Sequence, residues 1–139
     1  MLPQVGRPGT IEQIVTSLQA VLKLLAPYAN PQPWQPVVFQ NSFANYATTH
    51  LPCAYRKGAD GVVRLRGLAA RAAVALNTPI FTLPAGYRPN KEMNVVITAA
   101  GRSAAVAVAV TGAVTVFAAD AAAWNTDISF ACISFDTDM

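Results

Sequence analysis

YRKGADGVVRLRGL, residues 55–68, consists of a short strand-like run, a glycine-bounded turn and a second strand-like run. Gly58 and Gly61 can supply the positive φ angles that a tight hairpin turn requires. In the second run, Val63 and Leu65 alternate with arginines, so one face of the strand is apolar and the other is charged. This alternation is typical of an antiparallel sheet with one buried face. The stretch therefore predicts a β-hairpin.

Strand-like runs recur before and after the second arm of this hairpin at intervals of roughly ten residues, separated by turn residues. They are Val37–Phe39, Ala54–Arg56, Ala72–Leu76, Ile80–Leu83, Met93–Thr98, Ala104–Val110, Ala113–Ala118 and Asp127–Phe135. Seven or eight short strands in this pattern favour a β-sandwich or barrel. We therefore predict a mainly β, antiparallel domain over residues 37–139.

The stretch SAAVAVAVTGAVTVF, residues 103–117, is the least ordinary of these runs. Alanine and valine alternate up to a Thr-Gly turn, and valine and threonine alternate after it. Alanine is a poor strand former, but it lets neighbouring surfaces approach closely. Two interpretations are open. Either the valines fill the core of a thin hairpin, or the alanine face contacts another subunit.

A helix is predicted before the β domain, from Thr10 to Ala26. Thr10 and Gln13 have the spacing of a capping box, and Pro27 is expected to end the helix. Large apolar side chains recur along it at spacings of four and three, which form a heptad seam of just over two repeats. The seam residues are Ile11, Val15, Leu18, Leu22 and Leu25. Both a helix packed on its own domain and a parallel bundle between identical chains fit this pattern.

Prolines separate this helix from the β domain. Four of the ten residues from 27 to 36 are proline, which favours an extended, semi-rigid segment. We therefore divide the chain into an N-terminal arm and helix (residues 1–26), a linker (27–36) and a β-sandwich knob (37–139). The first unit is expected to anchor the protein and to join three chains.

Composition narrows the classes of function. Charged residues make up 12% of the chain and hydrophobic residues 53%, which favours burial of surface against other chains. The net charge of +3 comes without a Lys/Arg run, so nucleic-acid binding is not expected. No signal-peptide pattern opens the chain. The apolar stretch Ile11–Ala26 is too short and too often interrupted by polar residues to insert into a membrane.

The residues that carry catalytic or metal chemistry are few. The chain has one histidine, His50, and two cysteines, Cys53 and Cys132, which are too far apart for a CxxC site. We expect both cysteines to be reduced, buried and structural. One histidine and two cysteines supply too few ligands for zinc, and no cofactor is predicted. No nucleophile elbow or metal triad is present, so the chain is not expected to be an enzyme.

Four motifs between Pro33 and Phe135 resemble, in their order along the chain, the head domain at the ends of many bacteriophage tail-fibre and related virion-surface proteins. The segment PWQPVVFQNSFANY (Pro33–Tyr46) resembles the opening of that domain. The hairpin of residues 55–68, the stretch IFTLPAGYRP (Ile80–Pro89) and the terminal ISF (Ile133–Phe135) follow. The resemblance covers Pro33 to Phe135. It implies a jelly-roll-like antiparallel β-sandwich that forms a homotrimer and has no enzymatic activity.

The stretch IFTLPAGYRP is interpreted first as a structural corner between the sheets. Pro84 blocks further strand pairing and Gly86 permits the turn. Tyr87 can bury its ring while its hydroxyl finds a partner. Arg88 can donate hydrogen bonds to carbonyls at the corner, and Pro89 fixes the exit of the chain. The alternative interpretation is a Tyr-Arg pair that faces a ligand.

The function predicted first is that of a bacteriophage virion structural protein, a homotrimeric knob on the virion surface that is assembled in the host cytoplasm. Within this class we expect a capsid decoration (cement) protein, anchored by its N-terminal segment to other virion proteins. The alternative is a tail-fibre or baseplate tip that binds a receptor during host attachment.

A third possibility is a carbohydrate-binding adhesin, whose ligand would be a host surface glycan. Such a protein exposes aromatic rings beside carboxylates or amides. The candidate ligand-facing residues are Trp34, Tyr46, Trp124 and Asn125, with Asp127 beside the last two.

Overall fold

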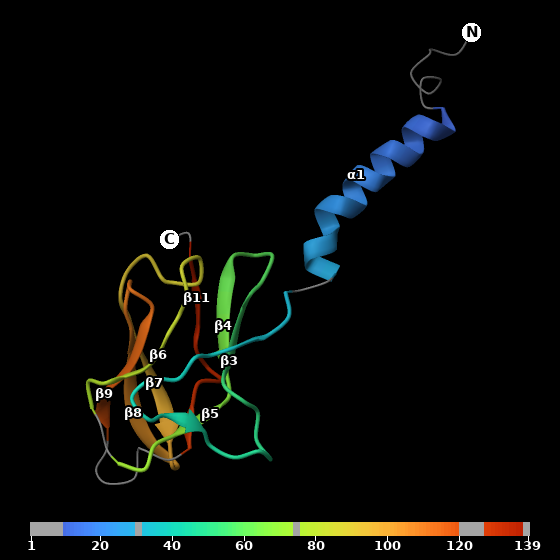
Figure 1. Ribbon diagram of the computed structural model, residues 1–139. Helices are drawn as coiled ribbons and strands as arrows, with labels where there is room; N and C mark the ends of the chain where they lie inside the picture. The colour runs from blue at the N-terminus through green and yellow to red at the C-terminus, as the bar shows by residue number, and fades with distance from the viewer. Residues whose placement is uncertain (1–9, 30–31, 74–75, 120–126, 138–139) are drawn as a thin grey trace.

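The computed structural model describes residues 10–29, 32–73, 76–119 and 127–137 (Figure 1). Within these ranges the chain forms one N-terminal helix followed by two antiparallel sheets that together make a β-sandwich. The predicted fold class, a mainly β sandwich preceded by one short helix, is confirmed. The jelly-roll topology stays a prediction.

The small sheet has the strand order β1, β3, β4, β11, with the bounds Gln35–Pro36, Ala54–Lys57, Val62–Arg66 and Ser134–Asp136. The large sheet has the strand order β2 (Ala44–Asn45), β5 (Leu68–Ala70), β10 (Ile128–Ser129), β7 (Met93–Ala99), β8 (Arg102–Val108), β9 (Ala113–Ala119) and β6 (Pro79–Thr82). Both predicted hairpins are confirmed, because β3 pairs with β4 and β8 pairs with β9.

Of the segments that carry the chain from one sheet to the other, two are short and lie side by side. β4 of the small sheet continues through Gly67 into β5 of the large sheet, and β10 of the large sheet continues through residues 130–133 into β11 of the small one. The segments remain paired at the crossing. The Phe130 N–H donates to the Gly67 carbonyl (3.1 Å), and the Leu65 N–H donates to the Ile133 carbonyl (3.0 Å). This crossing holds the two sheets together along one side.

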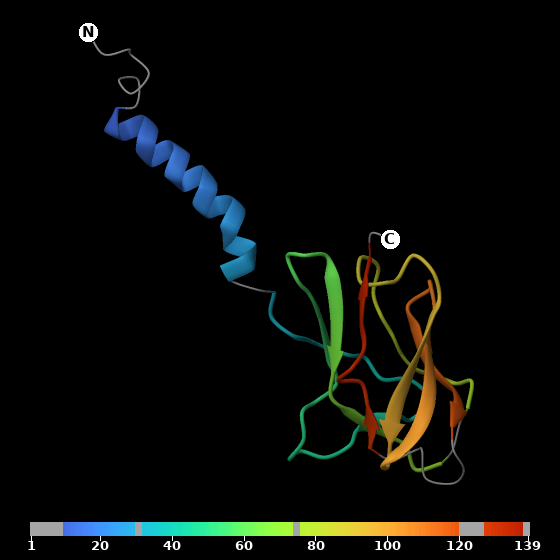
Figure 2. The same ribbon diagram turned by 180° about the vertical axis from the view of Figure 1, so that it is seen from behind.

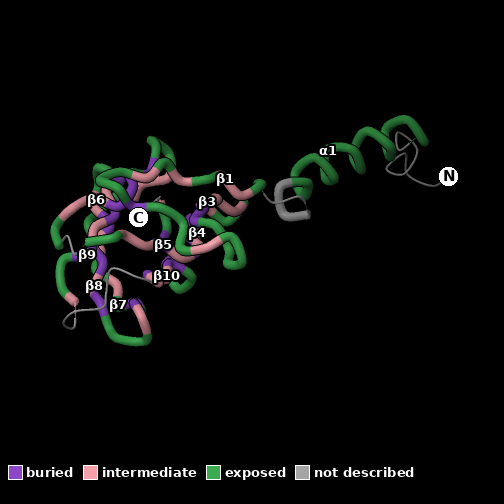
Figure 3. The backbone as a smooth tube through the Cα atoms, turned by 60° about the horizontal axis from the view of Figure 1, so that its bottom comes forward, coloured by how far each residue is buried: buried purple, intermediate pink, exposed green. Residues whose placement is uncertain are grey.

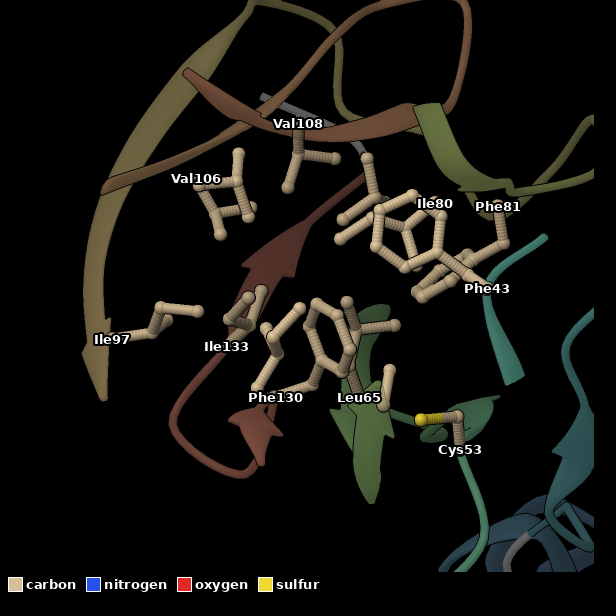
Figure 4. Packing of buried hydrophobic residues seen from close by; sticks show 14 of the residues in the cluster. Phe43, Cys53, Leu65, Ile80, Phe81, Ile97, Val106, Val108, Phe130 and Ile133 are labelled. Carbon is tan, nitrogen blue, oxygen red and sulfur yellow. The ribbon is translucent and has the colours of Figure 1, made fainter. Parts of the chain in front are cut away.

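The core lies where side chains of both sheets point toward one another (Figure 4). Phe81 and Phe130 meet edge to face in it, with ring centroids 5.3 Å apart. Four of the five valines in the Ala/Val hairpin are fully buried, namely Val106, Val108, Val114 and Val116, whereas Val110 beside the turn is 50% exposed. Burial of each of these four contributes about 1.5–3 kcal/mol before entropy is counted. The interpretation in which these valines fill the core is therefore confirmed.

Two predicted strands are each divided between the sheets. Val62–Leu68 becomes β4 and β5, and Asp127–Phe135 becomes β10 and β11. The apolar pattern continues through both crossings because the side chains stay against the same core. Periodicity alone therefore could not locate the bend at Gly67, where φ is 103°.

Two other predicted strands were wrong. In Val37–Phe39, Phe39 forms only an isolated bridge with Phe81, and the first strand is instead Gln35–Pro36. The described residues of Ala72–Leu76 lie outside any strand, and residues 74–75 are outside the described ranges. The strand in this region is β5, which ends at Ala70.

The helix α1 spans Ile11–Ala29 and projects away from the sheets in both views (Figures 1 and 2). Its cap is the predicted one, since the Gln13 N–H donates to Thr10 Oγ1 at 3.4 Å. The predicted end at Ala26 was three residues too early. Pro27 removes one helical hydrogen bond, but its fixed φ of about −65° is a helical value. No helix in the described ranges is long and apolar enough to cross a membrane.

Candidate functional site

The apolar seam of α1 lies on the surface of the molecule (Figure 3). The exposed fractions are 80% for Ile11, 43% for Val15, 57% for Leu18, 66% for Leu22 and 53% for Leu25. The neighbouring side chains Ile14, Val21 and Leu24 are also exposed. The interpretation in which the helix packs on its own domain was therefore wrong. Apolar surface that is contiguous and exposed on this scale marks an interaction site.

A second feature occupies the outer face of the small sheet. Arg56 on β3 pairs with Arg64 on β4, and Arg66 lies two residues further along β4 on the same face. Trp34 precedes β1 at the edge of this sheet. Both the Arg56 and the Arg66 guanidinium carbons lie over the Trp34 ring, each 4.4 Å from its centroid. Four side chains from three segments therefore form one cationic cluster, which we call the arginine cluster.

Among the described residues, Arg64 is the one arginine of the cluster that has an acidic partner. Arg64 pairs with Asp60 of the hairpin turn at 3.0 Å. The hydrogen bond from Arg64 lowers the pKa of Asp60 below its ordinary value. The stabilisation by this pair is present above the ordinary pKa of an aspartate and is lost as the pH falls through the lowered pKa. In the described ranges, Arg56 and Arg66 form no ion pair, and the buried Nε of Arg66 has no hydrogen-bond partner.

An open groove of about 470 Å³ lies beside this cluster. Trp34, Arg64, Arg66 and Ser134 form its polar lining, and Leu51 and Ile133 are among its apolar lining residues. Its walls come from the entry to β1, from β4 and from the start of β11. The groove therefore combines one arginine that forms no ion pair among the described residues, Arg66, with an apolar surface, and Arg56 lies beside the groove over the Trp34 ring.

The two candidate ligand-facing aromatic residues that the structure describes, Trp34 and Tyr46, do not form one site. Trp34 contacts the arginines of the small sheet. Tyr46 is 42% exposed and contacts the His50 ring, with centroids 5.1 Å apart, near an edge of the large sheet. Trp124 and Asn125 lie outside the described residues, and Asp127 is half-buried. Trp34 lies beside arginines, where the adhesin interpretation needed a carboxylate or an amide.

The polar groups of the Pro84–Pro89 corner already have partners within the protein. The Arg88 Nε donates to the Leu83 carbonyl at 2.8 Å. The Tyr87 hydroxyl donates to Gln32 Oε1 at 2.9 Å, and the Tyr87 ring meets Tyr55 of β3 edge to face at 4.9 Å. These contacts join the corner to the small sheet and support the structural interpretation over the ligand-facing one.

The expectation that both cysteines are buried was wrong for one of them. Cys53 is 2% exposed, whereas Cys132 is exposed in the turn between β10 and β11. Both are free thiols. The alternation of apolar residues around Cys132 did not distinguish a turn from a strand. Within the described ranges, no group of three His, Cys, Asp or Glu side chains could hold a metal ion.

This difference predicts selective labelling of the thiols. Burial raises the pKa of Cys53 to about 12, and the thiolate is the reactive form. Iodoacetamide at pH 8 is therefore expected to modify Cys132 in the folded protein and to modify Cys53 only after denaturation. Because the Cys53 pKa is raised on folding, its contribution to stability is lost as the pH rises from about 9 towards 12. Peptide mass spectrometry measures the labelling, and equal labelling of both cysteines would contradict the burial.

Sequence reasoning missed the arginine cluster, although it found some of its parts. The outward direction of Arg64 and Arg66 followed from the alternation in residues 62–66, and Trp34 was already a candidate. The register that places Arg56 beside Arg64, and the position of Trp34 across both strands, depend on strand pairing. A strand with two outward arginines next to a second strand with one was the available signal.

Comparisons with known proteins give a similarity of fold. No family model and no curated protein matches this chain. Among solved structures, the chain is similar to the receptor binding protein of Listeria phage PSA, with a TM-score of 0.60 and 15% sequence identity. The alignment covers 97% of this chain and 87% of that one. A coverage of 97% cannot be reached without α1, which contributes 19 of the 139 residues. The similarity therefore concerns the fold of helix and sandwich together.

Proposed function

We propose that this chain is a bacteriophage virion-surface protein that takes part in host attachment, as a trimer joined by α1. The observation that supports this most strongly is the fold similarity, across helix and sandwich, to a phage receptor binding protein. The motifs between Pro33 and Phe135 that resemble virion-surface head domains support the same class. The sequence alone favoured capsid decoration over attachment. The structural neighbour shifts the proposal to attachment.

The exposed seam of α1 supports the trimer. Five large apolar side chains per chain contribute about 1.5–3 kcal/mol each when they are buried, and a parallel bundle buries them against identical seams. A bundle of about two heptads is marginal by itself. A second contact between the chains is therefore part of the proposal.

The outer face of β7, β8 and β9 is the proposed second contact. Val96 on β7 is 70% exposed and lies opposite Ala105, which in turn lies opposite Ala118 on β9. Ala105 and Ala107 point outward between the buried valines, and Phe117 is also exposed on this part of the sheet. Small side chains flanked by larger apolar ones allow another chain to approach closely.

The position of the protein on the virion tests the proposal. Immunogold labelling with antibodies against the sandwich is expected to mark the tail of virions that contain this chain. Purified protein, added to host cells before the virions, is expected to reduce adsorption. Virions that lack the chain are the control. Label over the capsid would favour decoration, and virions without label would contradict the proposal.

A further inference from the structure

Within the described ranges, Arg56 and Arg66 of the arginine cluster have guanidinium N–H groups that no protein group accepts, whereas Arg64 donates to Asp60 and to the Val62 carbonyl. The N–H groups of a guanidinium lie in its own plane. A guanidinium that stacks on an aromatic ring therefore still directs them outward, as a rigid fork. Arg56 and Arg66 are both stacked on Trp34. Stacking therefore reduces the freedom of two long side chains without occupying their donors, and less entropy is lost when they bind a ligand.

The charge in this cluster is only partly balanced. Asp60 pairs with Arg64, and this is the only ion pair within the described ranges. Arg56 and Arg66 contact an aromatic ring in place of a carboxylate, although charged side chains this close to one another repel. The Arg66 Nε is buried without an acceptor, and a buried donor without a partner costs stability. An anion in the groove would relieve the repulsion and would accept hydrogen bonds from the forks.

The same stacking argues against a neutral sugar or a nucleobase as the ligand. Both are bound by stacking on an aromatic ring whose face is free. Two guanidinium groups already lie over the Trp34 ring. The groups that remain available are the cationic forks, and oxyanions that accept two parallel hydrogen bonds, such as phosphate and carboxylate, are their matching ligands.

We propose that the groove beside the arginine cluster binds an anionic polymer of the host surface through its phosphate or carboxylate groups. Arg66 in the lining of the groove and Arg56 beside it bind the oxyanion, and Trp34 orients both guanidiniums. Leu51 and Ile133 supply an apolar surface for the uncharged part of the ligand. The source of the ligand rests on the proposed role in host attachment, whereas the anion site itself rests only on the geometry of the cluster.

Binding to defined polymers tests the site. The probes are inorganic polyphosphate for phosphate, hyaluronate for carboxylate and dextran as the neutral polymer. Isothermal titration calorimetry on the full chain is expected to show binding to at least one anionic probe at low salt, with weaker binding as the salt concentration rises. Dextran is expected not to bind. Binding to only one of the anionic probes identifies the source of the oxyanion, and binding to neither would overturn the proposal.

Charge-matched variants separate this site from general attraction to a basic protein. Arg56→Gln/Arg66→Gln is expected to lower the affinity at least about tenfold, because charge-assisted hydrogen bonds are lost. Lys91→Gln/Arg102→Gln removes two charges from exposed positions of the large-sheet side and is expected to change the affinity less than about twofold. Arg56→Lys/Arg66→Lys keeps the charge without the planar fork and is expected to fall between them. An equal loss in both Gln pairs would overturn the proposal.

Two further measurements keep the outcomes distinct. Thermal unfolding reports whether each variant folds. If the double variant does not fold, the single variant Arg56→Gln, at a half-buried position on β3, replaces it. Arg56→Gln is expected to lower the affinity about threefold or more. If no anion binds while antibodies still mark the tail, the groove is wrong and the attachment role stands. If anions bind at the cluster while virions carry no label, the attachment role is wrong and the site stands.

Discussion

Leu18→Asp/Leu22→Asp is expected to convert the trimer into a monomer with an intact sandwich. Both leucines lie in the exposed seam of α1, at 57% and 66% exposure. Each contributes about 1.5–3 kcal/mol when it is buried, so the three chains together would lose on the order of 10 kcal/mol. The new carboxylates would also lie close to one another at the bundle axis. Sedimentation equilibrium measures the mass, and circular dichroism measures the β content.

The matched control places the same two charges on the opposite side of the helix. Gln13 and Ala20 are exposed, and helical periodicity places them away from the seam. Gln13→Asp/Ala20→Asp is therefore expected to remain a trimer. A wild-type protein that is a monomer at micromolar concentration would contradict the trimer itself. A seam variant that stays trimeric would assign the contact to the sandwich, with the outer face of β7–β9 as the first candidate.

Gly67→Ala is expected to destabilise the sandwich by more than about 4 kcal/mol, a value reserved for severe backbone and packing changes. Gly67 joins β4 of the small sheet to β5 of the large sheet, with φ at 103°. A Cβ atom at this position would lie 2.5 Å from backbone atoms of Pro52 and Cys53. Backbone cannot rotate away as a side chain can, so the crossing itself would have to move. A typical domain has only about 5–15 kcal/mol of stability in total.

Gly86→Ala is the control for the backbone conformation alone. Gly86 also has a positive φ, at 90°, but a Cβ there meets nothing within 4 Å. This variant is expected to cost about 1–2 kcal/mol, the cost of a left-handed conformation with a side chain. Urea unfolding of both variants measures the difference. Equal destabilisation would mean that the close approach at the sheet crossing does not limit the fold.

The local pattern was sufficient for the elements that are stabilised locally. Alternation in residues 62–66 predicted which side of β4 is buried, because side chains alternate in every strand. Thr10 capped α1 as expected, since its hydroxyl bonds the backbone three residues away. The same alternation supported one of the two interpretations of the Ala/Val hairpin, in which its valines face the core. In each case the interacting groups are neighbours in sequence.

The sequence did not distinguish one continuous strand from two strands that meet at a bend. Residues 62–68 keep an apolar alternation through Gly67, because both halves face the same core. The same is true of residues 127–135, where the turn brings Cys132 to the surface. The change of sheet becomes visible in the tertiary structure, where the Phe130 N–H donates to the Gly67 carbonyl at the point at which both segments cross.

By itself the sequence determined the mainly β class, the hairpins and the apolar seam of α1, because periodicity and turn chemistry act over a few residues. The tertiary structure alone decided that the seam stays uncovered by its own domain and that the chain changes sheet after β4 and after β10. It also decided that Arg56 and Arg66 meet at Trp34. These features join residues that are 10 to 60 or more positions apart, and their positions follow from strand register and from the packing of one sheet on the other.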